Sequence, residues 1–196
     1  MKKLVAVGAI TMALSGCFDK GAADDGLAKA ISAVNAIEVE NNSPDIAVKS
    51  WWRVKDSSAV VNGEICKSNL KLASPYFEKL TQLSTGDLST KGRCDVKPTA
   101  FDRQITKVDV QSDTRAVVTA QIKNVSPPEE GAILDDDDKK AKETGEPFQY
   151  VLERRDTKSG WKISKISNFP SYARDWQEVY KKHEPSTNRY VYDYYQ

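Results

Sequence analysis

Apolar residues recur at helical spacing near the start of the chain. Residues three or four positions apart predict a helix over about 25–38; they are Leu27, Ile31, Val34 and Ile37. Ser43 and Pro44 then predict the start of a second helix, because serine is a preferred N-cap residue and proline is favoured in the first turn. The apolar residues of that helix are Ile46, Val48, Trp51, Trp52 and Val54.

The pattern is weakest from about residue 58 to residue 100. Several apolar residues there indicate helical pieces that are interrupted at Ser74-Pro75; they are Leu70, Leu72, Tyr76, Phe77 and Leu80. Residues 84–93 have the composition of a loop. No regular element is predicted with clear bounds in this stretch.

Alternation of apolar and polar residues is clear in the second half. Four segments are predicted as strands: 103–110, 114–125, 148–152 and 161–166. Together they form an antiparallel meander with one apolar face, which needs a layer of helices to cover it. A last helix is predicted from Pro170-Ser171, with apolar residues Tyr172, Trp176, Val179 and Tyr180.

The first sixteen residues have the features of a secretory signal peptide. Lys2 and Lys3 precede an apolar run that is too short to cross a bilayer, and small residues follow it. Leu14-Ser15-Gly16-Cys17 resembles the lipobox of bacterial lipoproteins. The resemblance implies cleavage before Cys17 and acylation of this residue, with palmitate-type chains that anchor the protein in a membrane. The alternative is an ordinary signal peptide in which Cys17 is incidental.

The lipoprotein pattern also predicts where the protein lies. The anchor would place the domain in the periplasm, and the outer membrane is favoured because Asp19 is one position later than the aspartate that retains such proteins at the inner membrane. Residues 17–25 are predicted as the acylated cysteine and its tether, 26–188 as a single α+β domain, and 189–196 as a tyrosine-rich tail.

Charge excludes one class of partner. The chain has 29 basic and 28 acidic residues, and cleavage removes Lys2 and Lys3, so the mature net charge is near −1. Nucleic-acid binding needs clustered positive charge, so no nucleic acid is expected.

Cysteine use is consistent with an oxidising compartment. Once Cys17 is acylated, Cys66 and Cys94 remain as a pair, which predicts a disulfide; two buried free thiols are the alternative. A metal site is not expected, since the only histidine, His183, is far from both thiols in the sequence.

Residues 147–168 resemble the final hairpin of the nuclear-transport-factor-two-like (cystatin-like) fold, in which a Gly-Trp-Lys-Ile signature commonly opens the last strand. The resemblance covers about 44–170. It implies N-terminal helices packed on a strongly bent, cone-like antiparallel sheet of about four strands, to which the pattern adds a C-terminal helix. This fold includes isomerases, dehydratases, hydrolases and many binding modules, so it does not assign a function.

Enzymes of this fold work inside the cone, commonly with an Asp–His or an Asp–Tyr pair. His183 lies beyond the sheet, so Tyr150 and Asp109 are the candidate pair for an isomerase-like or hydrolase-like pocket. A core tyrosine and a surface aspartate are the preferred interpretation. The residues expected to line any pocket are Trp51, Trp52, Tyr150 and Trp161.

Two further segments have residue types that occur in binding sites. The run Asp135–Asp138 lies in an insert, 126–146, and lacks the alternation and turn glycine of a calcium loop, so a mobile, solvated loop is expected. Tyr190, Tyr192 and Tyr194 alternate in the tail, which predicts packing on the domain or contact with a partner. The sequence therefore predicts a lipoprotein without enzymatic activity or cofactor that binds or assembles with an envelope protein, the alternative being a small-ligand pocket near Tyr150.

Overall fold

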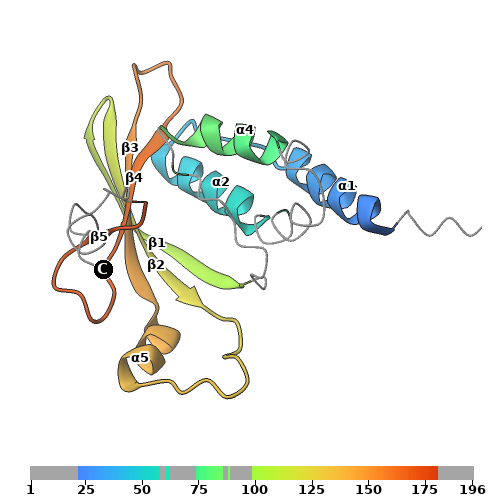
Figure 1. Cartoon of the computed structure of the whole chain (residues 1–196). Coiled ribbons are helices and arrows are strands. Elements are labelled where there is room, and N and C mark those ends of the chain that lie inside the picture. Colours follow the sequence, from blue (N-terminus) through green and yellow to red (C-terminus); the bar gives the residue numbers. More distant parts are fainter. Residues whose placement is uncertain (1–21, 58–60, 62–73, 86–87, 89–98, 181–196) are drawn as a thin grey trace, which may run out of the picture.

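The computed structural model describes residues 22–57, 74–85 and 99–180, together with Val61 and Leu88 (Figure 1). Within them lie the helices α1 (Ala22–Asn35), α2 (Pro44–Asp56), α4 (Ser74–Leu83) and α5 (Asp136–Thr144). The strands are β1 (Phe101–Ser112), β2 (Arg115–Asn124), β3 (Glu146–Glu153), β4 (Lys162–Asn168) and β5 (Gln177–Glu178). The α+β class is confirmed.

The strands form one antiparallel sheet in the order β1-β2-β3-β4-β5, which confirms the predicted meander. The sheet is not closed, and it has one strand more than expected, since the two residues of β5 pair with β4. Figure 1 shows α1, α2 and α4 on one side of the sheet, with α5 at the end of β3 opposite the β3–β4 hairpin.

The first helices follow the apolar pattern, with two differences. α1 begins at Ala22, inside the segment expected to be a tether. α4 begins at Ser74, where a break between helical pieces is predicted. Ser43 precedes α2 in an extended conformation, yet its hydroxyl donates to the Asp45 carboxylate at 2.7 Å and does not cap the helix. Proline in the first turn still explains the helix start, because its fixed φ suits a helix and its missing N–H would have no partner there.

The core lies between the helices and one face of the sheet. α2 contributes the buried residues Val48, Trp51, Trp52 and Val54, and the sheet contributes Ala116, Val118, Ala120, Tyr150, Leu152, Ile163 and Ile166. Both tryptophans of α2 are therefore in the core. Apolar burial of this kind is the main favourable term in folding.

The acidic insert contains a helix, so the expectation of a loop is wrong for residues 136–144. Asp135 is the N-cap of α5: its carboxylate accepts from the Asp138 N–H at 2.8 Å, and the Asp138 carboxylate accepts from the Asp135 N–H at 3.3 Å. This reciprocal capping satisfies two helix-end donors, and acidic residues in the first turn interact favourably with the helix dipole. The four aspartates therefore favour a helix start despite their mutual repulsion. Gly145, at φ 77°, follows the helix.

The predicted helix from Pro170-Ser171 is absent from residues 170–180. This segment contains turns and then β5, where Gln177 and Glu178 pair with Asn168 and Ser167 of β4. The Val179 N–H also donates to the Ile166 carbonyl at 3.0 Å, and Lys165 forms an ion pair with Glu178 at 3.3 Å. Without β5, this edge of β4 would be unpaired, and its backbone groups offer hydrogen bonds to the segment that follows. These bonds explain why the segment is a strand and not the predicted helix.

Several predictions concern residues outside the described ranges. These are the lipid-attachment residue Cys17, the cysteine pair Cys66 and Cys94, His183, and the tail at 189–196. They stay predictions.

Candidate functional site

Trp52 and Tyr150 form the centre of the predicted pocket. The Trp52 indole Nε1–H donates to the Tyr150 hydroxyl oxygen at 2.8 Å, and the two rings meet edge to face with centroids 6.0 Å apart. Both side chains are buried. Burial raises the pKa of Tyr150 to about 12, although the hydrogen bond from Trp52 opposes the shift. The phenol is therefore neutral at physiological pH and held in one orientation.

Arg103 of β1 lies at one end of this aromatic pair. Its guanidinium makes two hydrogen bonds to the Asp56 carboxylate, at 2.8 and 2.6 Å, and its Cζ lies 5.7 Å from the centroid of the Trp52 ring. The Arg103 side chain is only 14% exposed. A paired, largely buried guanidinium of this kind links α2 to the edge of the sheet.

Trp51 faces a different neighbour. The ammonium of Lys55 lies 5.8 Å from the Trp51 ring centroid and 5.7 Å from that of Tyr180, so the cation lies near two aromatic rings. Burial lowers the pKa of Lys55 and raises that of Tyr180. Tyr180, the last described residue of the chain, therefore lies beside α2 through its contact with Lys55.

Trp161 is buried directly before β4, with the Arg154 guanidinium 4.3 Å from its ring centroid. The four residues expected to line a pocket are thus all core residues. Trp52 and Tyr150 contact each other, whereas Trp51 and Trp161 have separate cationic neighbours. The cavities described below are lined by other residues.

The predicted Tyr150–Asp109 pair is contradicted by the strand register. Tyr150 is opposite Val118 on β2, and Val118 is opposite Val108 on β1, so Tyr150 shares a face with Val108. Asp109 is opposite Val117 and therefore lies on the other face of the sheet. The two side chains cannot form one oxyanion site.

Residues 169–180, here called the aromatic loop, present apolar side chains to solvent. Tyr172 is 81% exposed and Trp176 39% exposed, while Val179 is also exposed. The Trp176 ring packs edge to face on Phe169 at a centroid distance of 5.6 Å. Sequence reasoning found these residues but assigned them to a helix.

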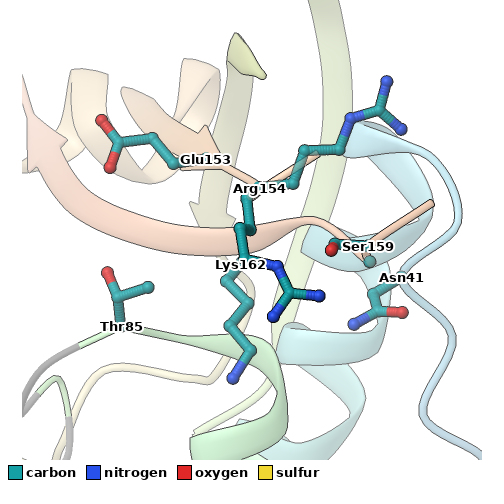
Figure 2. A pocket seen from close by; sticks show the side chains of 8 residues that line it. Asn41, Thr85, Glu153, Arg154, Ser159 and Lys162 are labelled. Atoms are coloured by element: carbon teal, nitrogen blue, oxygen red, sulfur yellow. The ribbon is translucent and has the colours of Figure 1, made fainter. Parts of the chain in front are cut away.

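A cavity of about 540 Å³, lined mostly by polar and charged residues, lies beside the β3–β4 hairpin, and we call it the hairpin cavity. Its walls come from Asn41 before α2, Thr85 after α4, and six residues of the hairpin: Glu153, Arg154, Arg155, Ser159, Gly160 and Lys162. Figure 2 shows the Lys162 side chain between Thr85 and Asn41, with the Glu153 carboxylate pointing away from it. Sequence reasoning missed this site, because the three segments come together only through tertiary packing.

A second cavity, of about 340 Å³, lies where α5 meets the sheet. Its apolar walls are formed by Phe101, Ile122, Leu134 and Phe148. Asp138 and Lys142 of α5 also line it. This cavity is more apolar in character than the hairpin cavity.

Comparison with known proteins assigns no family. The chain matches no protein-family model, no curated protein and no solved structure. In the described part of the chain, no three His, Cys, Asp or Glu side chains are grouped so that they could hold a metal ion. No helix of that part is long and apolar enough to cross a membrane.

Proposed function

We propose that this protein is a lipoprotein, anchored through acylated Cys17 with its domain facing the periplasm, that binds another envelope protein and does not catalyse a reaction. The lipobox-like sequence at 14–17 supports the anchor. The aromatic loop is the observation that supports binding. A nuclear-transport-factor-two-like domain is part of the proposal, supported by the order of helices and meander and by register shifts in β1 and β4, which bend strands.

The aromatic loop has the composition of a protein-binding surface. Tyrosine and tryptophan are enriched among residues that dominate binding energy at interfaces, and Tyr172 and Trp176 both reach solvent. The loop is held at both ends, by the Phe169 N–H bond to the Pro147 carbonyl at 3.0 Å and by β5. A loop held in this way loses little conformational freedom on binding, which favours affinity.

The interior gives less support to the alternative of an enzyme or ligand pocket around Tyr150. The Tyr150 hydroxyl already accepts a hydrogen bond from Trp52, and Asp109 lies on the opposite face of the sheet. The outer membrane remains the favoured location, on the position of Asp19 alone.

The anchor is tested by replacing the acylated residue. Cys17→Ser should move the protein from the membrane fraction to the soluble periplasmic fraction. Membrane association that persists in this variant would contradict acylation at Cys17.

The binding function is tested by capture from detergent-solubilised envelopes. A partner that co-purifies with the wild-type chain should be lost from the double variant Tyr172→Ala/Trp176→Ala. Ile133→Ala is the control, because Ile133 is an apolar side chain 94% exposed outside the loop. Equal recovery from all three chains, or a chain that carries a small molecule and no protein, would contradict the proposal.

A further inference from the structure

The hairpin cavity has positive charge that its own residues do not neutralise. Glu153 forms an ion pair with Arg115 at 2.7 Å, and Arg155 forms one with Asp156 at 3.0 Å. Hydrogen bonds from Ser159 and Arg155 lower the pKa of Asp156 to about 2, so that carboxylate stays ionised and paired with Arg155. Two lining cations then remain, Arg154 and Lys162.

Both remaining cations contact carbonyl oxygens instead of carboxylates. Lys162 donates to the Thr81 carbonyl at 3.2 Å, which leaves other ammonium hydrogens free to bond. Arg154 donates from Nε to the Asp113 carbonyl and from Nη1 to the Thr157 carbonyl, while its guanidinium lies over Trp161. These contacts hold the two side chains in place but do not cancel their charge.

Neutral donors complete the cavity. The side-chain amide of Asn41 and the Thr85 hydroxyl line it, and neither makes a side-chain hydrogen bond to a described residue. Their backbones are anchored, since the Trp161 N–H donates to the Asn41 carbonyl at 2.7 Å and the Thr85 N–H donates to the Ile163 carbonyl at 2.8 Å. At Gly160 a Cβ atom would overlap the Asn41 side chain, so glycine permits the close approach of the two segments.

We propose that the hairpin cavity binds a phosphate group, with Lys162 and Arg154 as its cationic contacts and Asn41 and Thr85 as neutral donors. A cavity of about 540 Å³ is large enough for a small molecule or a lipid headgroup. Lysine and arginine both bind phosphate through charge-assisted hydrogen bonds, and the carboxylate that would repel it, Glu153, is paired with Arg115 and turned away. This inference does not depend on the proposed protein partner.

The test is titration of the full secreted chain, carrying Cys17→Ser, with inorganic phosphate at constant ionic strength by calorimetry. Saturable binding is expected. Lys162→Gln should weaken it about tenfold, the effect of losing one charge-assisted hydrogen bond. Lys165→Gln is the charge-matched control on the same strand, because Lys165 does not line the cavity and pairs with Glu178; it should change affinity less than about twofold.

Thr85→Val keeps the inference testable if the lysine variant does not fold. It removes one hydroxyl at constant shape and should weaken phosphate binding about threefold or more. Co-sedimentation with phosphatidylglycerol vesicles that depends on Lys162 would identify a lipid headgroup as the source of the phosphate, while binding of inorganic phosphate without such co-sedimentation would identify a free phosphate compound. Absence of saturable binding, or equal weakening by Lys162→Gln and Lys165→Gln, would overturn the inference.

Discussion

Two aromatic pairs of similar geometry occupy very different places in this molecule. Trp52 and Tyr150 meet edge to face with centroids 6.0 Å apart and an interplanar angle of 73°, and Phe169 and Trp176 do so at 5.6 Å and 76°. The first pair is buried, and it joins α2 to β3 across 98 positions of the chain. The second pair spans a short loop, and Trp176 is 39% exposed.

The polar atoms of the two tryptophans make the difference clearer. The Trp52 N–H is bonded to Tyr150 inside the core, whereas the Trp176 N–H makes no hydrogen bond to a described residue. A buried donor must find its partner within the protein, but an exposed donor can use water or another molecule. Ring geometry alone therefore does not separate a core contact from a binding surface. Burial and hydrogen bonding do, and they predict a graded response to substitution.

The largest effect is expected for Trp52→Ala. Loss of this side chain leaves a cavity in the core, removes the partner of Tyr150 and exposes the inner face of Arg103, so the free energy of unfolding should fall by about 3–5 kcal/mol. Urea unfolding followed by circular dichroism measures it. A loss below about 2 kcal/mol would show that the core repacks around the site and that the pair is not a principal link between α2 and the sheet.

Tyr150→Phe isolates the hydroxyl. At neutral pH it leaves the Trp52 N–H without an acceptor, which should cost about 1–3 kcal/mol. The pKa of Tyr150 is about 12 in the folded chain, against 10.0 for an unperturbed tyrosine, so the unfolded chain ionises first as the pH rises. The stability that the wild-type hydroxyl confers is therefore full below about pH 10 and is lost between about pH 10 and 12, by up to about 3 kcal/mol.

The measurement for this second variant is the difference between wild type and Tyr150→Phe at about pH 8 and near pH 12. Taking the difference cancels most of the titration of Lys55 and Tyr180, which both chains contain. We expect the wild-type advantage to shrink as the pH rises. An advantage that is constant across this range would contradict the raised pKa.

Features of the fold that neighbouring residues determine can be predicted from the sequence, whereas features that depend on contacts between distant segments cannot. The main strands of the meander follow from local alternation and turn residues, and the structure confirms them. The capping pair Asp135 and Asp138 is also a local signal, although a run of like charges favours a loop over a helix. β5 could not be found locally, because Gln177 and Glu178 are strand residues only through the free edge of β4.

The candidate sites depend even more on contacts between segments that are distant in the sequence. The faces of Tyr150 and Asp109 depend on register, and a bulge near Thr106 reverses the alternation along β1, so counting along the strand does not place Asp109. The hairpin cavity combines Asn41, Thr85 and Lys162 from three segments that no sequence pattern connects. Residue types could suggest donors, but only the packing of the hairpin on the helices places them together.

Trp176→Ala should have an intermediate effect on stability. The side chain is partly buried against Phe169, so the loss of the aromatic contact and some apolar area should lower the free energy of unfolding by about 1–2 kcal/mol. The measurement is urea unfolding beside Trp52→Ala under the same conditions. A loss equal to that of Trp52→Ala would mean that the aromatic loop is a core element and that the contrast between the two pairs is wrong.

Tyr172→Ala should have the smallest effect of the series. The side chain is 81% exposed, and truncation of a surface residue of this kind usually changes the free energy of unfolding by no more than about 0.5 kcal/mol. The same variant should nevertheless reduce recovery of the proposed envelope partner, because an exposed tyrosine can supply contact area there without supporting the fold. Stability is measured by urea unfolding and binding by capture from solubilised envelopes, with Ile133→Ala as the control for a general loss of exposed apolar surface. A drop in stability above about 1 kcal/mol would place Tyr172 with the core residues. Unchanged stability together with unchanged capture would remove it from the proposed binding surface and leave Trp176 as the residue to test.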